Sequence, residues 1–422
     1  MSKAGGRMPN RQRHKRNIRQ AMPGTATMIN RRELVRTHAV RPHAKLSLPR
    51  KKKPEHPIQL KLSSILETSD SVQSALLQKT QAKDWQSLVH QYVNRYNQAE
   101  TEQHARVLSD FVTDDIHNER LGSRLARLRE RDLLRGALTA GSETKAKIMR
   151  LNEASGELTL LLQLHVSRRM EQNGLYYKEE RLETERLWLS RFDKQWAIVK
   201  VEPVIAERRP RYGSASQQWV TEHDAYPEET GTKTPSMPYL NYDLMRQFKH
   251  RPIPIQYRRE LAAEYADRWW NEGNPAYELF DVNCTNYVSQ CIFAGNAPMN
   301  YTDGRGSGWW YKGRNKGQEL WSYSWAVSHA LMTYLTAARK SGLRATMVQS
   351  ADELELGDVI TYDWNGDNRY QHSTIVTAFD AAGQPLVNAN TVASRHRYWD
   401  YQDSYAWTPQ TKYRFFHLSD TL

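Results

Sequence analysis

Both cysteines of the 422-residue chain lie in the stretch FDVNCTNYVSQCIFAG, as Cys284 and Cys291. On one helix, a spacing of seven residues corresponds to about 10.5 Å of helical rise, which is too long for a disulfide bond. The chain contains no Cys-x-x-Cys and no His-Glu-x-x-His motif, so the pattern supports neither a zinc site nor a cofactor. Two roles stay open for a cysteine here, a thiolate nucleophile or a small core side chain.

Position along the predicted helix distinguishes the two cysteines. Cys284 falls in the first turn, where free N–H groups and the helix dipole lower a thiol pKa and can bind an oxyanion. Asn283 precedes it and is a suitable N-cap. Cys291 lies two turns further along the same apolar stripe and is predicted to be a core residue. Cys284 is therefore the candidate nucleophile, and a purely structural role is its alternative.

A thiolate nucleophile needs a base, and the base needs a group that orients it. His372 is the best placed histidine, because it opens a predicted strand directly after the polar loop NGDNRYQ. The stretch FDAAGQP predicts a hairpin with a three-residue loop at 381–383. In that register Thr374 faces Asn390, and Asn390 becomes the diagonal same-face neighbour of His372. Asn388 is the alternative orienter, and a slip of one residue would move both asparagines to the other face.

Hydrophobic periodicity predicts the elements that position these residues. Residues 82–135 show a helical period, and three runs between Thr144 and Ala206 read as strands of an antiparallel sheet. This order predicts that the first part is an α+β unit with a shape somewhat like that of NTF2 or cystatin. The C-terminal part is also α+β, with helices followed by antiparallel strands. Its helices are predicted at 257–270, 284–295 and 324–342, and its strands at 358–364, 372–379, 385–390 and 412–418.

The chain is expected to divide into four segments: a basic arm at 1–57, an α+β domain at 58–206, a linker at 207–256 and an α+β domain at 257–422. Sixteen Lys or Arg and two Glu give the arm a charge of +14, whereas the whole chain carries +13. Such an arm is expected to be disordered, and either to contact an anionic surface or partner or only to aid solubility. No aromatic binding fold accompanies the charge, so specific nucleic-acid binding is not indicated.

The sequence shows no run of about 18 apolar residues and no readable signal peptide. This predicts no membrane span and a cytoplasmic location.

The C-terminal part resembles a known family. The motifs DVNCTNYVSQCIFAGNAPM, GWW, SYSW, LELGDVITYDWNGD, HSTIVTAFD and PLVNANT are similar to those of the "putative amidase domain" found mostly in Gram-positive, often spore-forming, bacteria. That domain is similar to the NlpC-type and CHAP-type branch of papain-like hydrolases. The resemblance covers about residues 257–418 and implies a papain-like fold with Cys284 as nucleophile, His372 as base and Asn390 as orienter. Asn283 departs from the Asp that usually precedes the family's cysteine, and the third residue of the site is often His.

The resemblance implies a cysteine-dependent amidase or peptidase acting on a cell-wall-type peptide or muropeptide. Trp309 and Trp310 lie in a glycine-flanked loop and are candidates to line a peptide cleft, and Tyr265 is placed near the thiol by resemblance alone. Two alternatives stay open. One is a non-catalytic binding or structural protein with an unreactive Cys284. The other is a transglutaminase-like acyl transferase, which would accept an amine in place of water.

Overall fold

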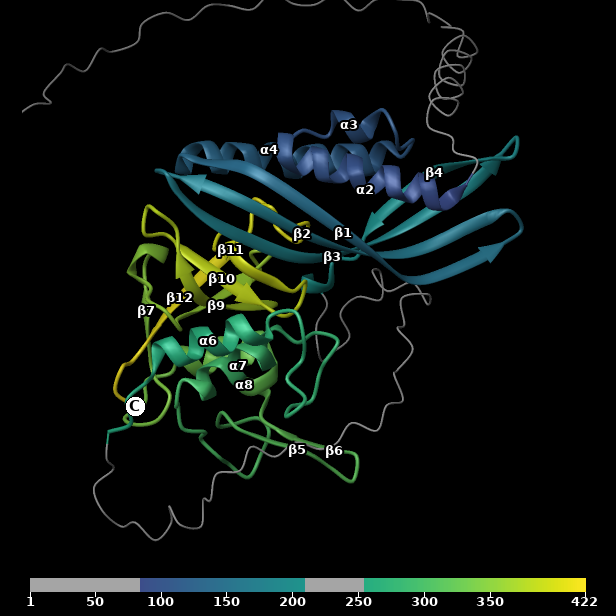
Figure 1. The fold of residues 1–422 in the computed structure, drawn as a ribbon. Helices are drawn as coiled ribbons and strands as arrows, with labels where there is room; N and C mark the ends of the chain where they lie inside the picture. The colour runs from purple at the N-terminus through teal and green to yellow at the C-terminus, as the bar shows by residue number, and fades with distance from the viewer. Residues whose placement is uncertain (1–83, 209–253) are drawn as a thin grey trace, which may run out of the picture. The chain divides into compact units, whose positions relative to one another are not determined.

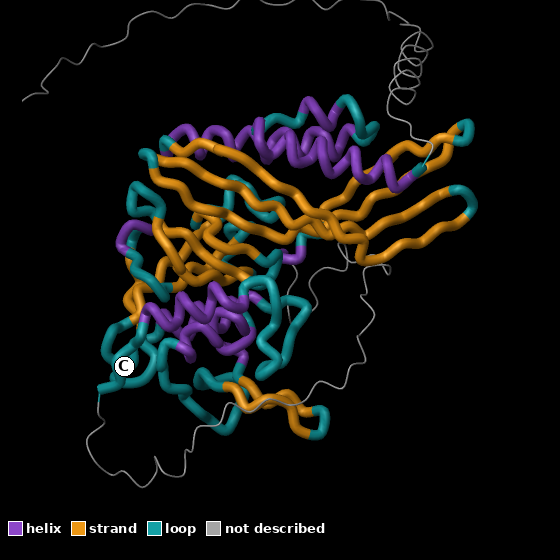
Figure 2. The backbone as a smooth tube through the Cα atoms, in the orientation of Figure 1, coloured by secondary structure: helices purple, strands orange, loops and turns teal. Residues whose placement is uncertain are grey.

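The computed structural model describes residues 84–208 and 254–422. The predicted basic arm at 1–57 and most of the predicted linker at 207–256 lie outside these residues. Both described segments combine helices with antiparallel strands, which confirms the expected α+β class (Figures 1 and 2).

The first segment places helices on one face of a sheet of long strands (Figure 1). The predicted helical region 82–135 consists of α2 (Trp85–Glu102), α3 (Arg106–Ser109) and α4 (Asp115–Arg135). Asp84 caps α2 by accepting hydrogen bonds from two backbone N–H groups, and Gly136 ends α4 in a left-handed conformation. The sheet then follows as β1 (Ala137–Ala154), β2 (Glu157–Gln172), β3 (Leu175–Phe192) and β4 (Gln195–Pro203), and a short 3₁₀ turn at Ala206–Arg208 ends the segment.

The core of this segment follows directly from the two periodicities. Every second residue of β2 from Leu158 to Val166 is buried, whereas the residues between them stay partly accessible on the opposite face. The helical stripe of α2 packs on the buried face and comprises Leu88, Val89, Tyr92, Val93 and Tyr96. The opposite face of β2 and β3 is therefore available to contact the rest of the chain.

The second segment begins with α6 (Arg259–Trp269) and α7 (Cys284–Ala294), close to the predicted bounds. The helix predicted at 324–342 is wrong in extent, because Val327 is extended (φ −125°, ψ 123°) and divides it into α8 (Tyr323–Ala326) and α9 (Ser328–Thr336). The predicted strands are β8 (Val359–Asp363), β9 (His372–Phe379), β10 (Pro385–Ala389) and β12 (Lys412–Leu418). Strands that the pattern did not reveal are β5 (Tyr311–Asn315), β6 (Gln318–Trp321), β7 (Ala345–Val348) and β11 (Ser394–Tyr398), and a 3₁₀ turn at Ala351–Glu353 follows β7.

One ten-stranded sheet runs through both segments in the order β1-β2-β3-β11-β10-β9-β8-β12-β7, with β4 also paired to β3. The junction is the antiparallel pairing of β11 with β3, where Ser394 faces Arg181. In the second segment, one face of the sheet packs against α6, α7 and α9, and the other face carries a smaller aromatic cluster. The two faces matter for the site, because successive residues of a strand point to opposite faces.

Buried ion pairs also join the two segments. Arg124 of α4 is fully buried, pairs with Glu100 at 2.6 Å and Glu183 at 3.2 Å, and donates from Nε to the carbonyl of Asp403 at 2.6 Å. Arg131, one heptad further along α4, reaches the carboxylates of Asp400 and Asp403. Truncating one member of such a network leaves an uncompensated buried charge, so these arginines fix α4 against the loop after β11.

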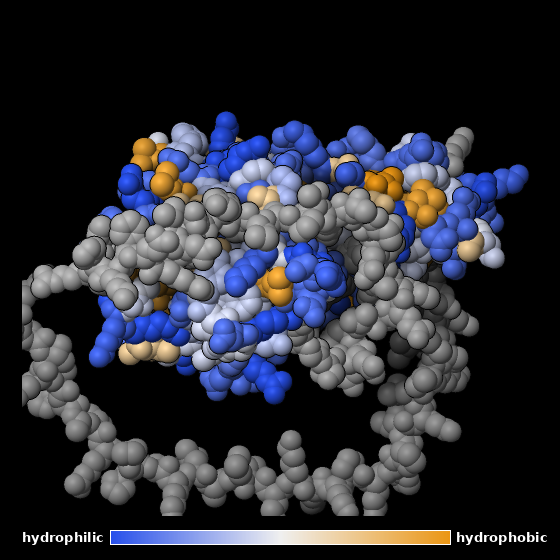
Figure 3. Space-filling model, turned by 90° about the horizontal axis from the view of Figure 1, so that it is seen from below, coloured by the Kyte–Doolittle hydropathy of each residue, from blue (hydrophilic) through white to orange (hydrophobic). Residues whose placement is uncertain are grey.

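Figure 3 shows a face of the molecule in which the described atoms are mostly hydrophilic, with hydrophobic residues scattered among them. Within residues 84–208 and 254–422, no helix is both long and apolar enough to span a membrane.

Candidate functional site

Cys284 is the first residue of α7, as the sequence predicts, but Asn283 is not its side-chain cap. The hydroxyl of Thr391 takes that place, since its Oγ1 accepts from the backbone N–H of Asn283 at 2.8 Å and of Cys284 at 2.9 Å. The Asn283 Oδ1 instead accepts from the backbone of Phe280 and from the amide of Asn286. The N–H of Cys284 is thus occupied, so an oxyanion would have to use later N–H groups of the first turn.

The thiol of Cys284 is buried, with 2% of the residue exposed. Its Sγ lies 3.7 Å from Thr285 Oγ1 and 4.0 Å from the carbonyl oxygen of Gln371. Burial raises the pKa of the Cys284 thiol, and hydrogen bonding from the backbone of Ser373 and the hydroxyl of Thr285 opposes that rise. The sulfur therefore sits against the start of β9, between the residues that flank His372.

Three hydroxyl groups beneath the thiol form a buried chain that the sequence analysis missed. Thr285 Oγ1 lies 3.3 Å from Ser373 Oγ, which donates to Ser328 Oγ at 2.8 Å. Ser328 in turn donates to the backbone carbonyl of His372 at 2.8 Å. This chain connects the heads of α7 and α9 with β9 and holds the backbone of His372 beside the thiol.

The side chain of His372 lies on the opposite face of β9 from α7. Its ring centroid is 5.3 Å from that of Tyr401, 5.6 Å from Tyr362 and 5.7 Å from Trp364. The ring is fully buried, and neither nitrogen has a hydrogen-bond partner among residues 84–208 and 254–422. Burial, and then the nearby Arg397 guanidinium, lower the pKa of His372 to about 3. The structure therefore brings the backbone of His372 to Cys284 but not its imidazole.

The hairpin register explains why the predicted contact between His372 and an asparagine is absent. The pairing begins as expected, with Pro385 opposite Phe379, but a bulge then shifts it by one residue, so Val387 faces Val376 and Asn388 faces Ile375. The predicted pairing of Thr374 with Asn390 is wrong for this reason. A shift of one residue moves both asparagines to the face opposite the His372 ring.

Asn390 approaches the head of α7 instead. Its Oδ1 accepts from the Asn283 amide at 2.6 Å, and its own amide donates to the carbonyls of Trp269 and Trp270. Asn388 donates to Asp267 at 2.8 Å and accepts from the Thr377 hydroxyl at 2.8 Å. Asn390 thus lies next to the residue that precedes the nucleophile, whereas Asn388 belongs to a separate polar cluster.

The three aromatic residues predicted for a cleft lie elsewhere. Trp309 and Trp310 are both buried in the main core of the second segment, where their indole N–H groups donate to Ser289 and to Ser307 respectively. The expectation that they line a cleft is wrong, because the glycine-flanked loop folds inward over the core. Tyr265 donates to Gln290 Oε1 at 2.8 Å, more than one turn beyond Cys284 on α7.

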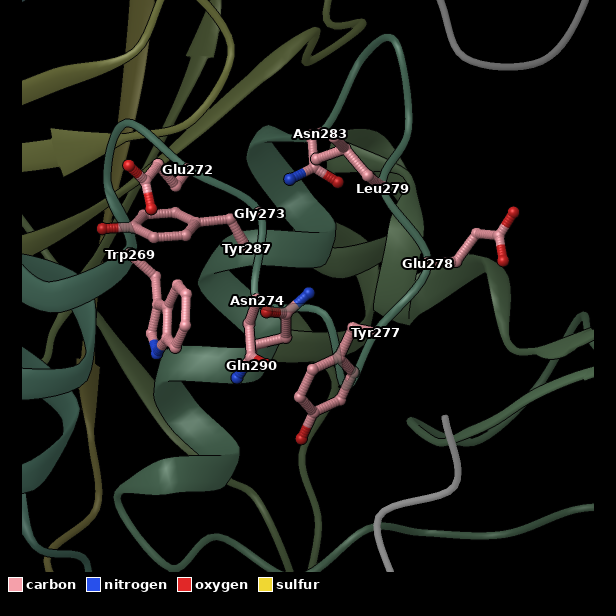
Figure 4. Close-up of a pocket in the computed structure, with 10 residues that line it drawn as sticks. All are labelled: Trp269, Glu272, Gly273, Asn274, Tyr277, Glu278, Leu279, Asn283, Tyr287 and Gln290. Atoms are coloured by element: carbon pink, nitrogen blue, oxygen red, sulfur yellow. The ribbon is translucent and has the colours of Figure 1, made fainter. Parts of the chain in front are cut away.

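One small hollow lies at the head of α7, and a larger one lies beside the loop that precedes this helix. Figure 4 shows the smaller one, lined by α7 and the loop before it and including Asn283, Tyr287 and Gln290. Its volume of about 10 Å³ holds roughly one water molecule. The larger is a cleft of about 270 Å³ that Asn390 and Phe280 line together with residues of β2 and β3. Only the cleft is large enough for an organic ligand.

Comparison with known proteins agrees with the resemblance noted in the sequence. Residues 256–416 match the family model described as "Putative amidase domain". The "Uncharacterized protein YhbB" of Bacillus subtilis (strain 168) is 54% identical over 166 residues, 39% of this chain. The match spans about half of that curated relative, 51% of its length. No solved structure matches the chain significantly. The expected resemblance of the C-terminal part is confirmed, and at a coarse level it supports an amidase-type hydrolase.

Proposed function

We propose that the second segment is a cysteine-dependent amidohydrolase with Cys284 as its nucleophile. The observation that carries this proposal is the setting of the sulfur, at the first residue of α7 and against the two peptide groups that flank His372. A buried structural cysteine has no need of a helix N-terminus, whereas a nucleophile gains from the helix dipole and from N–H groups that bind an oxyanion.

In the proposed reaction, the Cys284 sulfur attacks the carbonyl carbon of an amide. His372 takes the thiol proton and gives it to the leaving amine, and water then hydrolyses the thioester. This role requires the backbone at the start of β9 to rearrange, because rotation about the Cα–Cβ bond alone would leave the His372 ring on the face of β9 opposite the sulfur. The described arrangement is then a resting form, because burial holds the thiol and the imidazole neutral in it.

Asn390 has a different part in this proposal from the one expected. Because it bonds Asn283 and the carbonyls that end α6, it positions the residue before the nucleophile. Thr391 completes that support by binding the first two N–H groups. Orientation of the His372 ring by Asn390, the role implied by resemblance, would need both side chains to move.

The proposed substrate is a peptide amide of the cell-wall type, which rests on the family resemblance. Its test is the release of amine from neutral peptide amides and muropeptides by the full chain. Cys284→Ser should abolish the release, and the matched variant Cys291→Ser should retain it, since Cys291 is a buried core residue. Equal activity of the two variants would exclude Cys284 as the nucleophile.

A second candidate is a binding or structural protein with the same fold. The observation in its favour is that the thiol is buried and bonds no imidazole, while the His372 nitrogens have no partner within the described residues. This candidate predicts no amide hydrolysis and a Cys284 that is unreactive in the folded protein.

A further inference from the structure

The larger cleft takes its walls from both described segments. Gln163 and Thr184 face each other across β2 and β3, and Leu182 is two residues along β3 on the same face. The other wall includes Asn271, Phe280 and Asn390 from the second segment. We propose that this cleft binds the peptide substrate of Cys284, so that the first segment acts as a substrate-recognition domain; this inference rests on the proposed function.

The wall formed by β3 is held firmly against the site. The backbone N–H of Leu182 donates to the carbonyl of Ala393 at 2.8 Å, and β3 pairs with β11 at Arg181 and Ser394. Ala393 follows Thr391 by two residues, and Thr391 binds the head of α7. The backbone of the first segment is therefore connected to the residues that support the nucleophile.

Two residues that line the cleft are bonded to the residue before the nucleophile. Asn390 lines it and accepts a hydrogen bond of 2.6 Å from Asn283, which directly precedes Cys284. Phe280 lines it as well, and its backbone N–H donates to the Asn283 side chain. A ligand in the cleft would thus contact two of the residues that bond Asn283.

The lining indicates the chemical class of the ligand. None of the residues lining the cleft is charged. The side chains of Gln163, Thr184 and Asn271 form no hydrogen bond with any other described residue, so two amides and one hydroxyl are available to a ligand. Leu182, Phe280 and Val392 add apolar surface, as small-ligand sites do. An uncharged stretch of an extended peptide fits this lining, whereas a charged group of the same peptide would have to lie outside the cleft.

The test uses two thiol reagents on the full chain carrying Cys291→Ser. Acetyl-Ala-Ala-chloromethyl ketone presents a neutral peptide to the cleft, and iodoacetamide reports the reactivity of the thiol alone. Labelling of Cys284 is followed by mass spectrometry at increasing reagent concentrations. We expect saturation with the peptide reagent and a linear dependence with iodoacetamide.

Two substitutions at matched positions then locate the peptide. Thr184→Arg places a long side chain in the cleft. The control, Ser190→Arg, introduces the same side chain on the same face of β3, six residues away and outside the cleft. We expect Thr184→Arg to raise the half-saturating concentration of the peptide reagent at least tenfold and to leave the iodoacetamide rate within twofold. Ser190→Arg should change neither. Equal effects of the two variants, or no effect of Thr184→Arg, would overturn the proposal.

A binding measurement separates this proposal from the proposed function. If neither reagent labels Cys284, the catalytic proposal fails, and acetyl-Ala-Ala-amide is titrated into the isotope-labelled protein by NMR. Shifts at Leu182 that Thr184→Arg abolishes would support the cleft as a peptide site without catalysis. The absence of shifts in the wild-type protein would overturn it.

Discussion

Replacing Thr391 with Val tests whether this hydroxyl supports the head of α7. The substitution keeps the shape of the side chain but leaves the N–H groups of Asn283 and Cys284, now bonded at 2.8 and 2.9 Å, without their acceptor. An unsatisfied buried donor costs about 1–3 kcal/mol. Both residues are nearly buried, although the small hollow beside Asn283 could admit one water. We therefore expect the free energy of unfolding to fall by about 2–4 kcal/mol.

Urea unfolding followed by tryptophan fluorescence measures this loss, and Thr391→Ser is the matched control. Serine keeps the hydroxyl and removes one methyl group, which costs about 1 kcal/mol. Hydrogen exchange at the amide of Cys284 should accelerate in Thr391→Val and stay slow in Thr391→Ser. A valine variant that is as stable as the serine variant would refute the capping role.

Three further predictions concern buried ionisable side chains. Arg124→Met should lower the free energy of unfolding by about 3–5 kcal/mol in a urea titration, because Glu100 and Glu183 lose a buried partner. Arg127 is only partly buried, so the control variant Arg127→Met should lose less stability. His372→Phe keeps a ring in the aromatic cluster. The pKa of His372 is about 3 in the folded protein and near 6.5 in the unfolded chain, so the wild type loses stability as the pH falls from about 6.5 toward 3. Between pH 7 and pH 4, the free energy of unfolding of the variant should therefore fall by roughly 3 kcal/mol less than that of the wild type. Burial raises the pKa of Glu185 to about 7, so the stability linked to its protonated form is present below about pH 4.5 and lost as the pH rises through 7. Glu185→Gln keeps an acceptor for the Tyr92 hydroxyl. The variant should be about 1–3 kcal/mol more stable than the wild type at pH 8.5 and equally stable near pH 4.5. A constant difference in stability across this pH range would contradict the ionisation of Glu185.

Local patterns were sufficient to predict the elements that carry the candidate site. The helix starting at Cys284 and the strand at 372–379 both have the expected starting residue, because each combines a strong period with polar residues just before it. One of the three runs predicted as strands between Thr144 and Ala206 likewise forms β2. These features depend on a few neighbouring residues, so the sequence alone is enough to show them.

The relative placement of the elements was harder to predict. The bulge in β9 opposite Val387 adds one residue to one strand, and no turn signal or period marks it, yet it decides which face the asparagines occupy. No proline or glycine near Val327 marks the break between α8 and α9 in the sequence. Thr391 could have been suspected only as a polar residue at the end of a strand, since its role depends on a contact with α7 that spans 107 residues of chain.

The alkylation rate of Cys284 as a function of pH tests the central claim most directly. It is measured with iodoacetamide in the Cys291→Ser protein and repeated with His372→Ala. If the imidazole reaches the thiol in solution, labelling will be fast well below pH 8.5 and slower without His372. Labelling that follows an ordinary or raised thiol pKa and is unchanged by His372→Ala would contradict the catalytic proposal and favour the non-catalytic binding protein.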